Sequence, residues 1–492
     1  MRIHHSIEYS IQSLVLIAVA CGISGIASAQ DKSTDVSKVE RLNRAPVSKE
    51  VLRVQLPKPA VVKLKNGLTL VLLEDHKLPT VTFSMSIRPG QLADPADLPG
   101  LASFTAGMLR EGTARRTSAQ ISTEVDTLGA SLNAGSGFGS SSTNVNASGL
   151  INDAAAVLDL MSDIVMHPSF PTSELAQYKQ RQQSALEQSF SNPAFLAQRA
   201  FRRALYVDEP FSVTSTTREA IEKITPDDLK KFHDQHYKPG NALFGVTGDF
   251  KTDEMRALIE KYFGDWSGAA EAPLALPKPA APQPAKIILV DRPASVQTYI
   301  LGGDRGIRRT DPDYYALSVM NQVLGSGPQS RFFLDLREEH GYTYGVYSST
   351  FSETYPGHWN VATPVRTAVT DGSMTQLVYE IKRINTEPVP QAELEDSRRT
   401  IVAGFALSLE QPNQVLGYWL SAQYYGFPAD YWDKFPDRIA AIDATAVQAA
   451  AKKYVDLDHM QWVAVGDRKQ IQDVLKKYGP VTVVDAEGKP EN

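Results

Sequence analysis

The chain has 492 residues, which is too long for one hydrophobic core and predicts roughly two to four domains. Hydrophobic residues make up 42% and charged residues 22%, as in an ordinary globular protein. The net charge of −6 argues against nucleic acid or an anionic membrane surface as a partner. After the N-terminal segment, the sequence has no apolar run long enough for a transmembrane segment.

The N-terminal segment has the pattern of a secretory signal peptide. An apolar stretch from Leu14 to Ile26 ends at Ala27-Ser28-Ala29, which is typical of a small-residue cleavage site. We therefore expect residues 1–29 to be removed and the protein to be secreted, most simply to the periplasm. The alternative is lipid attachment at Cys21, the only cysteine, which would give a membrane-attached lipoprotein. A chain that begins at Gln30 has no cysteine, so its metal ligands would have to be His, Asp or Glu.

Residues 30–55 are polar and aperiodic, and they are interpreted as a mobile leader. Two β-rich runs then flank Asn66-Gly67, which predicts a hairpin. A strand at Thr80–Arg88 and a helix at Pro99–Arg110 follow. Helix and strand patterns alternate beyond this point, with helices expected at 153–166 and 173–190 and a strand at 243–247.

The second half repeats the order of the first. Residues 268–285 are rich in Ala and Pro and are predicted to be a linker, after which a strand pattern resumes at Lys286. Gly248-Asp249 recurs 218 residues later as Gly466-Asp467, each time between a strand and an amphipathic helix. This repeat predicts duplication of one domain of about 220 residues. The predicted boundaries are 56–267 for the first domain, 286–480 for the second and 481–492 for a tail. Two unrelated α/β domains with similar endings are the alternative.

A series of motifs in a fixed order resembles the pitrilysin/insulinase family of zinc peptidases. The motifs are Asn66-Gly67-Leu68, Gly100 to Thr113, Leu128-Gly129-Ala130, Leu132-Asn133-Ala134, His236 to Asn241, Val246 to Asp249, Leu324 to Gly327 and Leu336 to Tyr344. The resemblance covers about residues 55 to 480. It implies an α+β fold of two homologous domains, each a mostly antiparallel β-sheet flanked by helices.

The zinc motif of this family is absent. Catalytic members carry His-x-x-Glu-His on the helix that follows Gly100-Leu101, where two histidines bind zinc and the glutamate is the general base. The matching positions are Ser103, Ala106 and Gly107, which offer no useful ligand and no base. We interpret the small-residue face either as close packing against a neighbouring helix or as a shallow hollow. The chain is therefore expected to bind no cofactor itself.

Two further sets of residues could replace the lost ligands. The third family ligand should fall near Ser184 or Ala185, where Glu187 would stand alone. An independent peptidase with an unrecognised metal site, perhaps formed by Glu174 and Glu187, is one alternative. The pair His233 and His236 is interpreted as surface or packing residues, because the repeated helix has Ala and Tyr at the same positions.

The resemblance also implies two substrate-contacting elements. An arginine and a tyrosine seven positions later, here Arg337 and Tyr344, would reach the substrate opposite the metal. Arg337 is expected in the last turn of a helix from 332 to 340, and Tyr344 on a strand from 342 to 347. The alternative is an arginine paired with a neighbouring acid (Glu338, Glu339 or Asp335) and a tyrosine packed across strands. Asn133 and Ala134 are expected to bind peptide backbone at a sheet edge, although the adjoining tract is unusually rich in Gly and Ser.

These observations favour a non-catalytic subunit of a secreted peptidase. A zinc-bearing homologue would form a heterodimer with this chain, hold the zinc and cleave peptides in an enclosed chamber. This chain would supply Arg337 and Tyr344. A structural or peptide-binding protein with no role in proteolysis is the other alternative.

Overall fold

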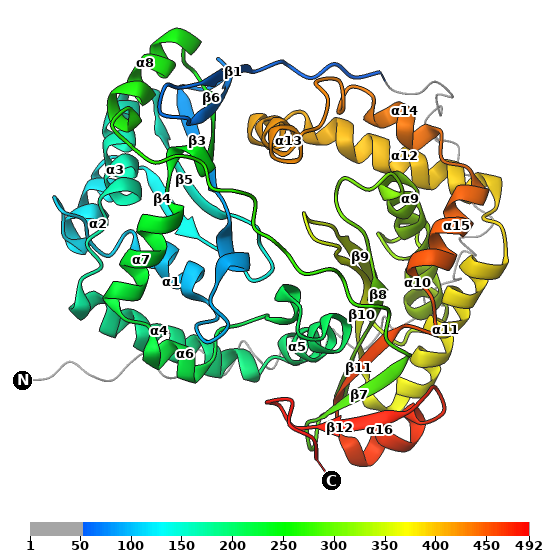
Figure 1. Ribbon diagram of the computed structural model, residues 1–492. Helices are drawn as coiled ribbons and strands as arrows, with labels where there is room; N and C mark the ends of the chain where they lie inside the picture. Colours follow the sequence, from blue (N-terminus) through cyan, green and yellow to red (C-terminus); the bar gives the residue numbers. More distant parts are fainter. Residues whose placement is uncertain (1–52, 492) are drawn as a thin grey trace, which may run out of the picture. The chain divides into compact units, whose positions relative to one another are not determined.

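The computed structural model describes residues 53–491 (Figure 1). The predicted signal peptide, most of the leader and the lipid-attachment alternative at Cys21 lie outside these residues. Within the described part, none of the helices combines the length and apolar character needed to cross a membrane.

The first half of the chain builds a six-stranded sheet in which only β2 and β6 pair in parallel. The predicted hairpin is confirmed: β1 and β2 pair antiparallel around Gly67, whose φ of +97 suits glycine. In spatial order the strands are β1 (Ala60–Lys63), β2 (Thr69–Glu74), β6 (Ala242–Gly248), β3 (Thr80–Ile87), β5 (Thr143–Leu150) and β4 (Ser131–Gly135).

Four helices of the first half begin at a side chain that accepts a hydrogen bond from the first turn. Thr117 and Thr225 each form a capping box, with Gln120 and Asp228 respectively. The helices predicted at 99–110, 153–166 and 173–190 are confirmed as α1, α3 and α4. The eight helices described here are α1 (Leu101–Met108), α2 (Ser118–Thr127), α3 (Ala154–Met166), α4 (Thr172–Phe190), α5 (Pro193–Tyr206), α6 (Arg218–Lys223), α7 (Pro226–His236) and α8 (Thr252–Phe263).

The second sheet repeats the strand order of the first, so the expected α+β fold of two homologous domains is confirmed. The two sheets differ at one edge. In the first, β1 lies antiparallel to β2, whereas in the second the C-terminal β12 lies parallel to β7. Residues 481–484, assigned to the tail from sequence, form this strand. The order is β12 (Val481–Val484), β7 (Lys286–Asp291), β11 (Gln461–Gly466), β8 (Gln297–Arg305), β10 (His358–Arg366) and β9 (Tyr347–Phe351).

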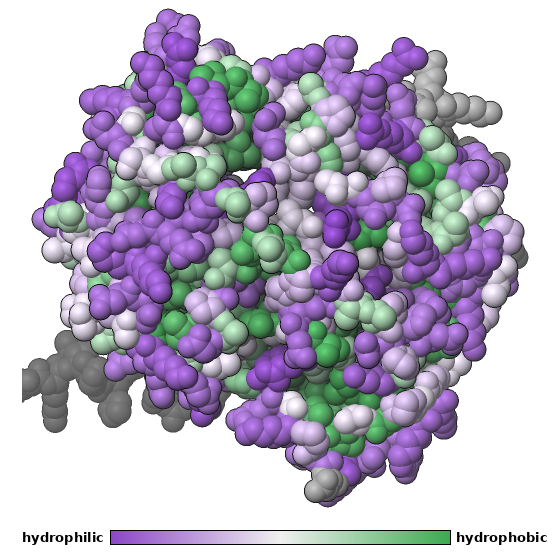
Figure 2. All heavy atoms as spheres, in the orientation of Figure 1, coloured by the Kyte–Doolittle hydropathy of each residue, from purple (hydrophilic) through white to green (hydrophobic). Residues whose placement is uncertain are grey.

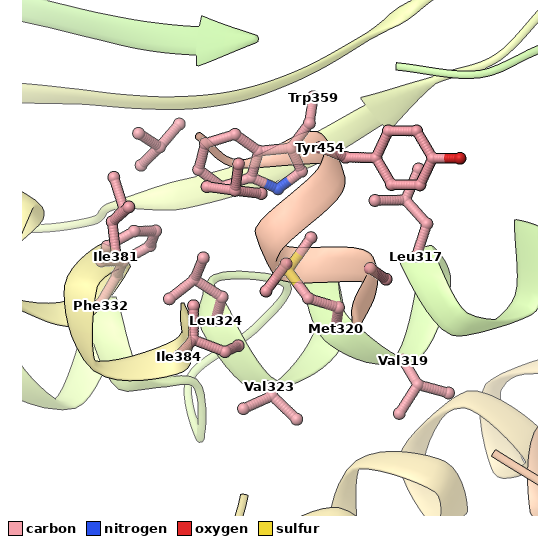
Figure 3. Packing of buried hydrophobic residues seen from close by; sticks show 14 of the residues in the cluster. Leu317, Val319, Met320, Val323, Leu324, Phe332, Trp359, Ile381, Ile384 and Tyr454 are labelled. Carbon is pink, nitrogen blue, oxygen red and sulfur yellow. The ribbon is translucent and has the colours of Figure 1, made fainter. Parts of the chain in front are cut away.

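The helix α9 is buried on two sides in the second domain. Figure 3 shows Met320 and Leu324 pointing toward Trp359 of β10, while Val319 and Val323 point the other way. All five side chains are at most 1% exposed, so apolar residues of α9 are buried both toward the sheet and on the side away from it. The helices are α9 (Tyr314–Leu324), α10 (Arg331–Phe333), α11 (Thr370–Thr386), α12 (Gln391–Ser408), α13 (Pro412–Tyr425), α14 (Phe435–Ala440), α15 (Ala444–Tyr454) and α16 (Arg468–Leu475).

Each half contributes a helix to the sheet of the other half. Helix α5 packs on β8 and β11 (Figure 1). Phe201 of this helix is fully buried in a cluster with Leu301 and Val463. Helix α13 packs on β6 and β2, with Leu420 against Gly245. The sequence boundary between the halves therefore does not divide the hydrophobic core.

The Ala/Pro-rich segment 268–285 contains no helix or strand and is fixed by hydrogen bonds to both halves. The Glu271 amide donates to Asn241 Oδ1 (2.8 Å), and Gln461 Nε2 donates to the Pro284 carbonyl (3.0 Å). Hydrophilic side chains cover most of the molecular face in Figure 2, with apolar residues showing in smaller patches.

Candidate functional site

The helix α1 follows Gly100 and carries the positions that match the zinc motif of the pitrilysin/insulinase family. It begins after Gly100, which has a left-handed backbone, and Asp94 supports its first turn. The two carboxylate oxygens of Asp94 accept hydrogen bonds from the amides of Gly100 (2.6 Å) and Ala102 (2.8 Å). Burial nevertheless raises the pKa of Asp94 to about 7. The first turn of α1 is thus held by Asp94. Ser103, Ala106 and Gly107, three and four positions apart, share one face of this helix.

Tyr178 of α4 closes the space where a side chain at position 107 would project. A Cβ placed on Gly107 would lie 2.0 Å from Tyr178 Oη and 2.6 Å from its Cζ. The Tyr178 ring also packs edge-on against Phe104, with ring centroids 5.1 Å apart. Of the two interpretations of the small-residue face, the structure therefore shows close helix packing at Gly107.

The residues on this face do not fit zinc. Ala106 and Gly107 have no donor atom, and Ser103 has only a neutral hydroxyl, whereas zinc sites use Cys, His, Asp or Glu. A histidine at position 107 would also overlap the tyrosine ring, because its Cβ alone does so.

The acidic residues of α4 do not complete a site either. Glu174 and Glu187 are thirteen residues apart on one helix, which separates them by about 20 Å along its axis. They cannot hold the same ion. Glu187 is 62% exposed and lies 3.6 Å from Arg218. The Glu174–Glu187 alternative is therefore excluded by helix geometry.

The two close histidines are packing residues, as predicted. His233 and His236 are each 7% exposed. His233 Nε2 lies 2.8 Å from the Val165 carbonyl, and His236 Nδ1 lies 2.9 Å from Glu271. Burial lowers the pKa of His233, which favours the neutral imidazole.

Arg337 lies on a helix, as predicted, but Tyr344 does not lie on a strand. The helix α10 continues as a π-helix from Leu334 to Glu339, and β9 begins only at Tyr347. The predicted strand over 342–347 is therefore wrong for its first five residues. The Thr343 hydroxyl oxygen lies within this irregular segment, 2.7 Å from the Pro364 carbonyl, to which it can donate, and 3.0 Å from the Gly345 carbonyl.

Tyr344 is 93% exposed, so it is not a cross-strand packing residue. Arg337 is less free. Its side chain is 43% exposed, its Nε lies 3.5 Å from Glu338, and its guanidinium carbon lies 4.7 Å from the ring centroid of Phe333. An exposed ion pair of this kind contributes little to stability. Both side chains can therefore reach a second molecule without disrupting the fold.

The strand β4, with Asn133 and Ala134, lies at the edge of the first sheet and pairs only with β5 among the described strands. Asn133 is exposed and Ala134 is half-buried. The Gly/Ser-rich tract that follows is held in place: the Gly139 amide donates to Gln91 (2.8 Å), and the Ser141 hydroxyl lies 2.6 Å from that of Tyr424. This edge can accept an extended strand.

Two features could not be predicted from the sequence, one between α1 and α4 and one on the π-helix. The contact of Tyr178 with Gly107 joins residues 71 positions apart, and no local pattern indicates it. The cluster of Asp335, Glu339 and His340 was missed because His340 lies five positions after Asp335, whereas neighbours on an α-helical face are three or four positions apart.

The two homologous α+β domains, with α1 at the position of the family's zinc motif, define a two-domain protein of the metallopeptidase-like class. The insulinase (peptidase family M16) model matches residues 69–214, and the peptidase M16 inactive domain model matches residues 223–401. The chain therefore belongs to the insulinase family of peptidases.

Similar proteins include both a zinc protease and a subunit of the cytochrome b-c1 complex. The crystal structure of a peptidase M16 inactive domain from Pseudomonas fluorescens superposes with a TM-score of 0.77 at 27% identity, covering 83% of this chain and 98% of that one. An uncharacterized zinc protease of Bacillus subtilis is 24% identical over 72% of this chain and 85% of its own length. Cytochrome b-c1 complex subunit 1 of Caenorhabditis elegans is 24% identical over 87% of this chain and 92% of its own length.

Proposed function

We propose that this chain is the non-catalytic subunit of a secreted zinc peptidase of the insulinase type. A homologous partner would carry the zinc motif in its own first domain and hold the metal. This chain would complete the site with Arg337 and Tyr344, and peptides would be the substrates.

The observation that carries the proposal is the contrast between two places in the chain. At α1 the ligand positions are small residues and Tyr178 takes up the space at position 107. On the second domain Tyr344 remains 93% exposed and Arg337 43% exposed, with only a weak local pair. The first place favours loss of zinc, and the second favours contacts with another molecule.

The chemistry of the pair suits peptide hydrolysis. The scissile carbonyl oxygen becomes anionic as water adds to the carbon. The guanidinium of Arg337 and the hydroxyl of Tyr344 would each donate a hydrogen bond to this oxygen, and the fixed positive charge of Arg337 would add electrostatic stabilisation. Asn133 and Ala134 would hold the peptide backbone by adding it to the edge of β4.

A purely structural subunit is the second candidate. The similarity to cytochrome b-c1 complex subunit 1 over 87% of the chain favours it, because that relative is named as a subunit of an assembly and not as a protease. In this case Arg337 and Tyr344 would have no catalytic role.

Reconstitution with a zinc-motif homologue from the same source separates the two candidates. We expect the mixture to hydrolyse peptides and Arg337→Ala to abolish turnover while the complex still forms on a sizing column. Arg399→Ala is the control, since Arg399 has a similar exposure of 45% and a similar pairing with Asp396. Unchanged turnover with Arg337→Ala would favour the structural subunit.

A further inference from the structure

Three metal-ligating side chains meet on the short helix that carries Arg337. Asp335, Glu339 and His340 each offer one ligand atom, and these atoms all lie within 4.8 Å of one another. The helix is a π-helix here, in which the His340 amide donates to the Asp335 carbonyl over 3.0 Å. A hydrogen bond from i+5 to i stacks residues five positions apart. In an α-helix, only residues three or four positions apart share a face. The π-helix is therefore what brings His340 to Asp335.

The Asp335 carboxylate is buried and incompletely satisfied. Only 9% of its side chain is exposed. Its Oδ1 lies 2.8 Å from His340 Nδ1, and the same nitrogen lies 3.1 Å from the backbone carbonyl of Asp335. Within residues 53–491, Oδ1 accepts no well-aligned hydrogen bond. When Nδ1 carries no proton, the two atoms face each other as electron-pair donors, an arrangement that a cation between them would satisfy.

Two arginine side chains in this region, Arg383 and Arg331, form ion pairs with carboxylates outside the cluster. Arg383 pairs with Glu380 (3.2 Å) and with Glu387 (3.4 Å). Arg331 forms a two-pronged pair with Glu393, with both contacts at 2.8 Å.

Glu339 forms no ion pair with any residue that the structure describes. Two carboxylates thus face one imidazole with an excess of negative charge.

We propose that Asp335, Glu339 and His340 form a binding site for a divalent transition-metal ion of the zinc type. One imidazole and two carboxylates are a donor set that zinc accepts, and three protein ligands leave a position open to solvent or to another molecule. This site is in the second domain and is separate from the lost zinc position on α1.

The bound ion would fix the end of the helix to its buried first turn. Glu339 and His340 are the last residues before Gly341, whose φ of +62 turns the chain into the segment that presents Tyr344. The metal would therefore hold the start of the Tyr344 segment. Its binding does not depend on the proposed subunit function, so the two can fail separately.

Calorimetric titration of the chelator-stripped full chain with zinc chloride tests the site. We expect one equivalent of zinc whose affinity falls at least about tenfold in Asp335→Asn and in His340→Ala, since even loss of an outer-shell partner costs this much. Glu338→Gln is the matched control, because it removes an exposed carboxylate from the same helix without touching the cluster. This control should bind zinc like the wild type, and zinc should raise the melting temperature of both.

A second variant guards against misfolding of Asp335→Asn. Glu339→Gln changes an exposed side chain and should weaken zinc binding by a similar factor. Failure of the wild type to bind zinc would overturn the site. So would zinc binding at wild-type affinity in both His340→Ala and Glu339→Gln, because the ion would then lie elsewhere in the chain.

Discussion

Substituting Gly107 by alanine tests whether the zinc position has closed around Tyr178. Alanine is normally the better helix former, by about 1 kcal/mol over glycine. At position 107, however, its Cβ would lie 2.0, 2.6 and 3.0 Å from three atoms of the Tyr178 side chain. These distances are far below van der Waals contact, so a shift of a few tenths of an ångström would not relieve the overlap. A larger shift would move the Tyr178 ring out of its packing against Phe104. Overpacking costs about 1 to 3 kcal/mol. We take the upper end and subtract the helix preference, which gives a net loss of about 2 kcal/mol.

Urea denaturation followed by circular dichroism measures this loss against a matched control. Gly404 lies on helix α12, and a Cβ added there would have no atom within 4 Å, so Gly404→Ala should stabilise the protein by up to about 1 kcal/mol. In a Tyr178→Ala background, Gly107→Ala should cease to be destabilising, since the clashing ring is gone. A Gly107→Ala protein as stable as Gly404→Ala would refute the packing account.

Three other outcomes are expected. Tyr344→Phe should lower kcat of the reconstituted peptidase by about 10²- to 10³-fold, as for loss of one oxyanion donor, with no change in melting temperature, whereas Tyr379→Phe (52% exposed) should be neutral in peptide-hydrolysis assays. Burial lowers the pKa of His358 to about 3, so the unfolded chain binds a proton there below pH 6.5 while the folded chain does not. Stability should therefore fall as pH drops from 6.5 toward 3, by about 1.4 kcal/mol per pH unit, and His358→Gln should remove this part of the pH dependence in denaturation curves. Phe201→Ala should cost about 3 to 5 kcal/mol in the same assay, because α5 seats this ring in the core of the second sheet; a cost below about 1 kcal/mol would contradict that packing.

Local patterns predicted much of the fold. Asn66-Gly67 marked a hairpin because few other residue pairs allow such a tight turn, and the structure has that hairpin. The 218-residue spacing of Gly-Asp predicted duplication, and the two sheets share one strand order. Both signals are local or periodic, so the sequence carries them directly.

Tertiary contacts set the features that could not be predicted. Alternating residues at 342–347 resembled a strand, but β9 begins only at Tyr347, and Thr343 before it forms hydrogen bonds of its own to Gly345 and Pro364. The exchange of α5 and α13 between the sheets leaves no local signal, because an apolar helix face does not say which sheet it covers. The π-helix at Leu334–Glu339 changes which residues share a face, and an α-helical period cannot reveal it.

A peptidase assay of this chain alone tests most directly whether it is a non-catalytic subunit. Purified chain should be incubated with a quenched fluorescent peptide, with and without a chelator, and then with the zinc-motif homologue. The account predicts no cleavage by the chain alone, even with zinc bound at Asp335, and cleavage that appears only when the homologue is added. Chelator-sensitive cleavage by the isolated chain, lost on substitution of its own residues, would contradict it.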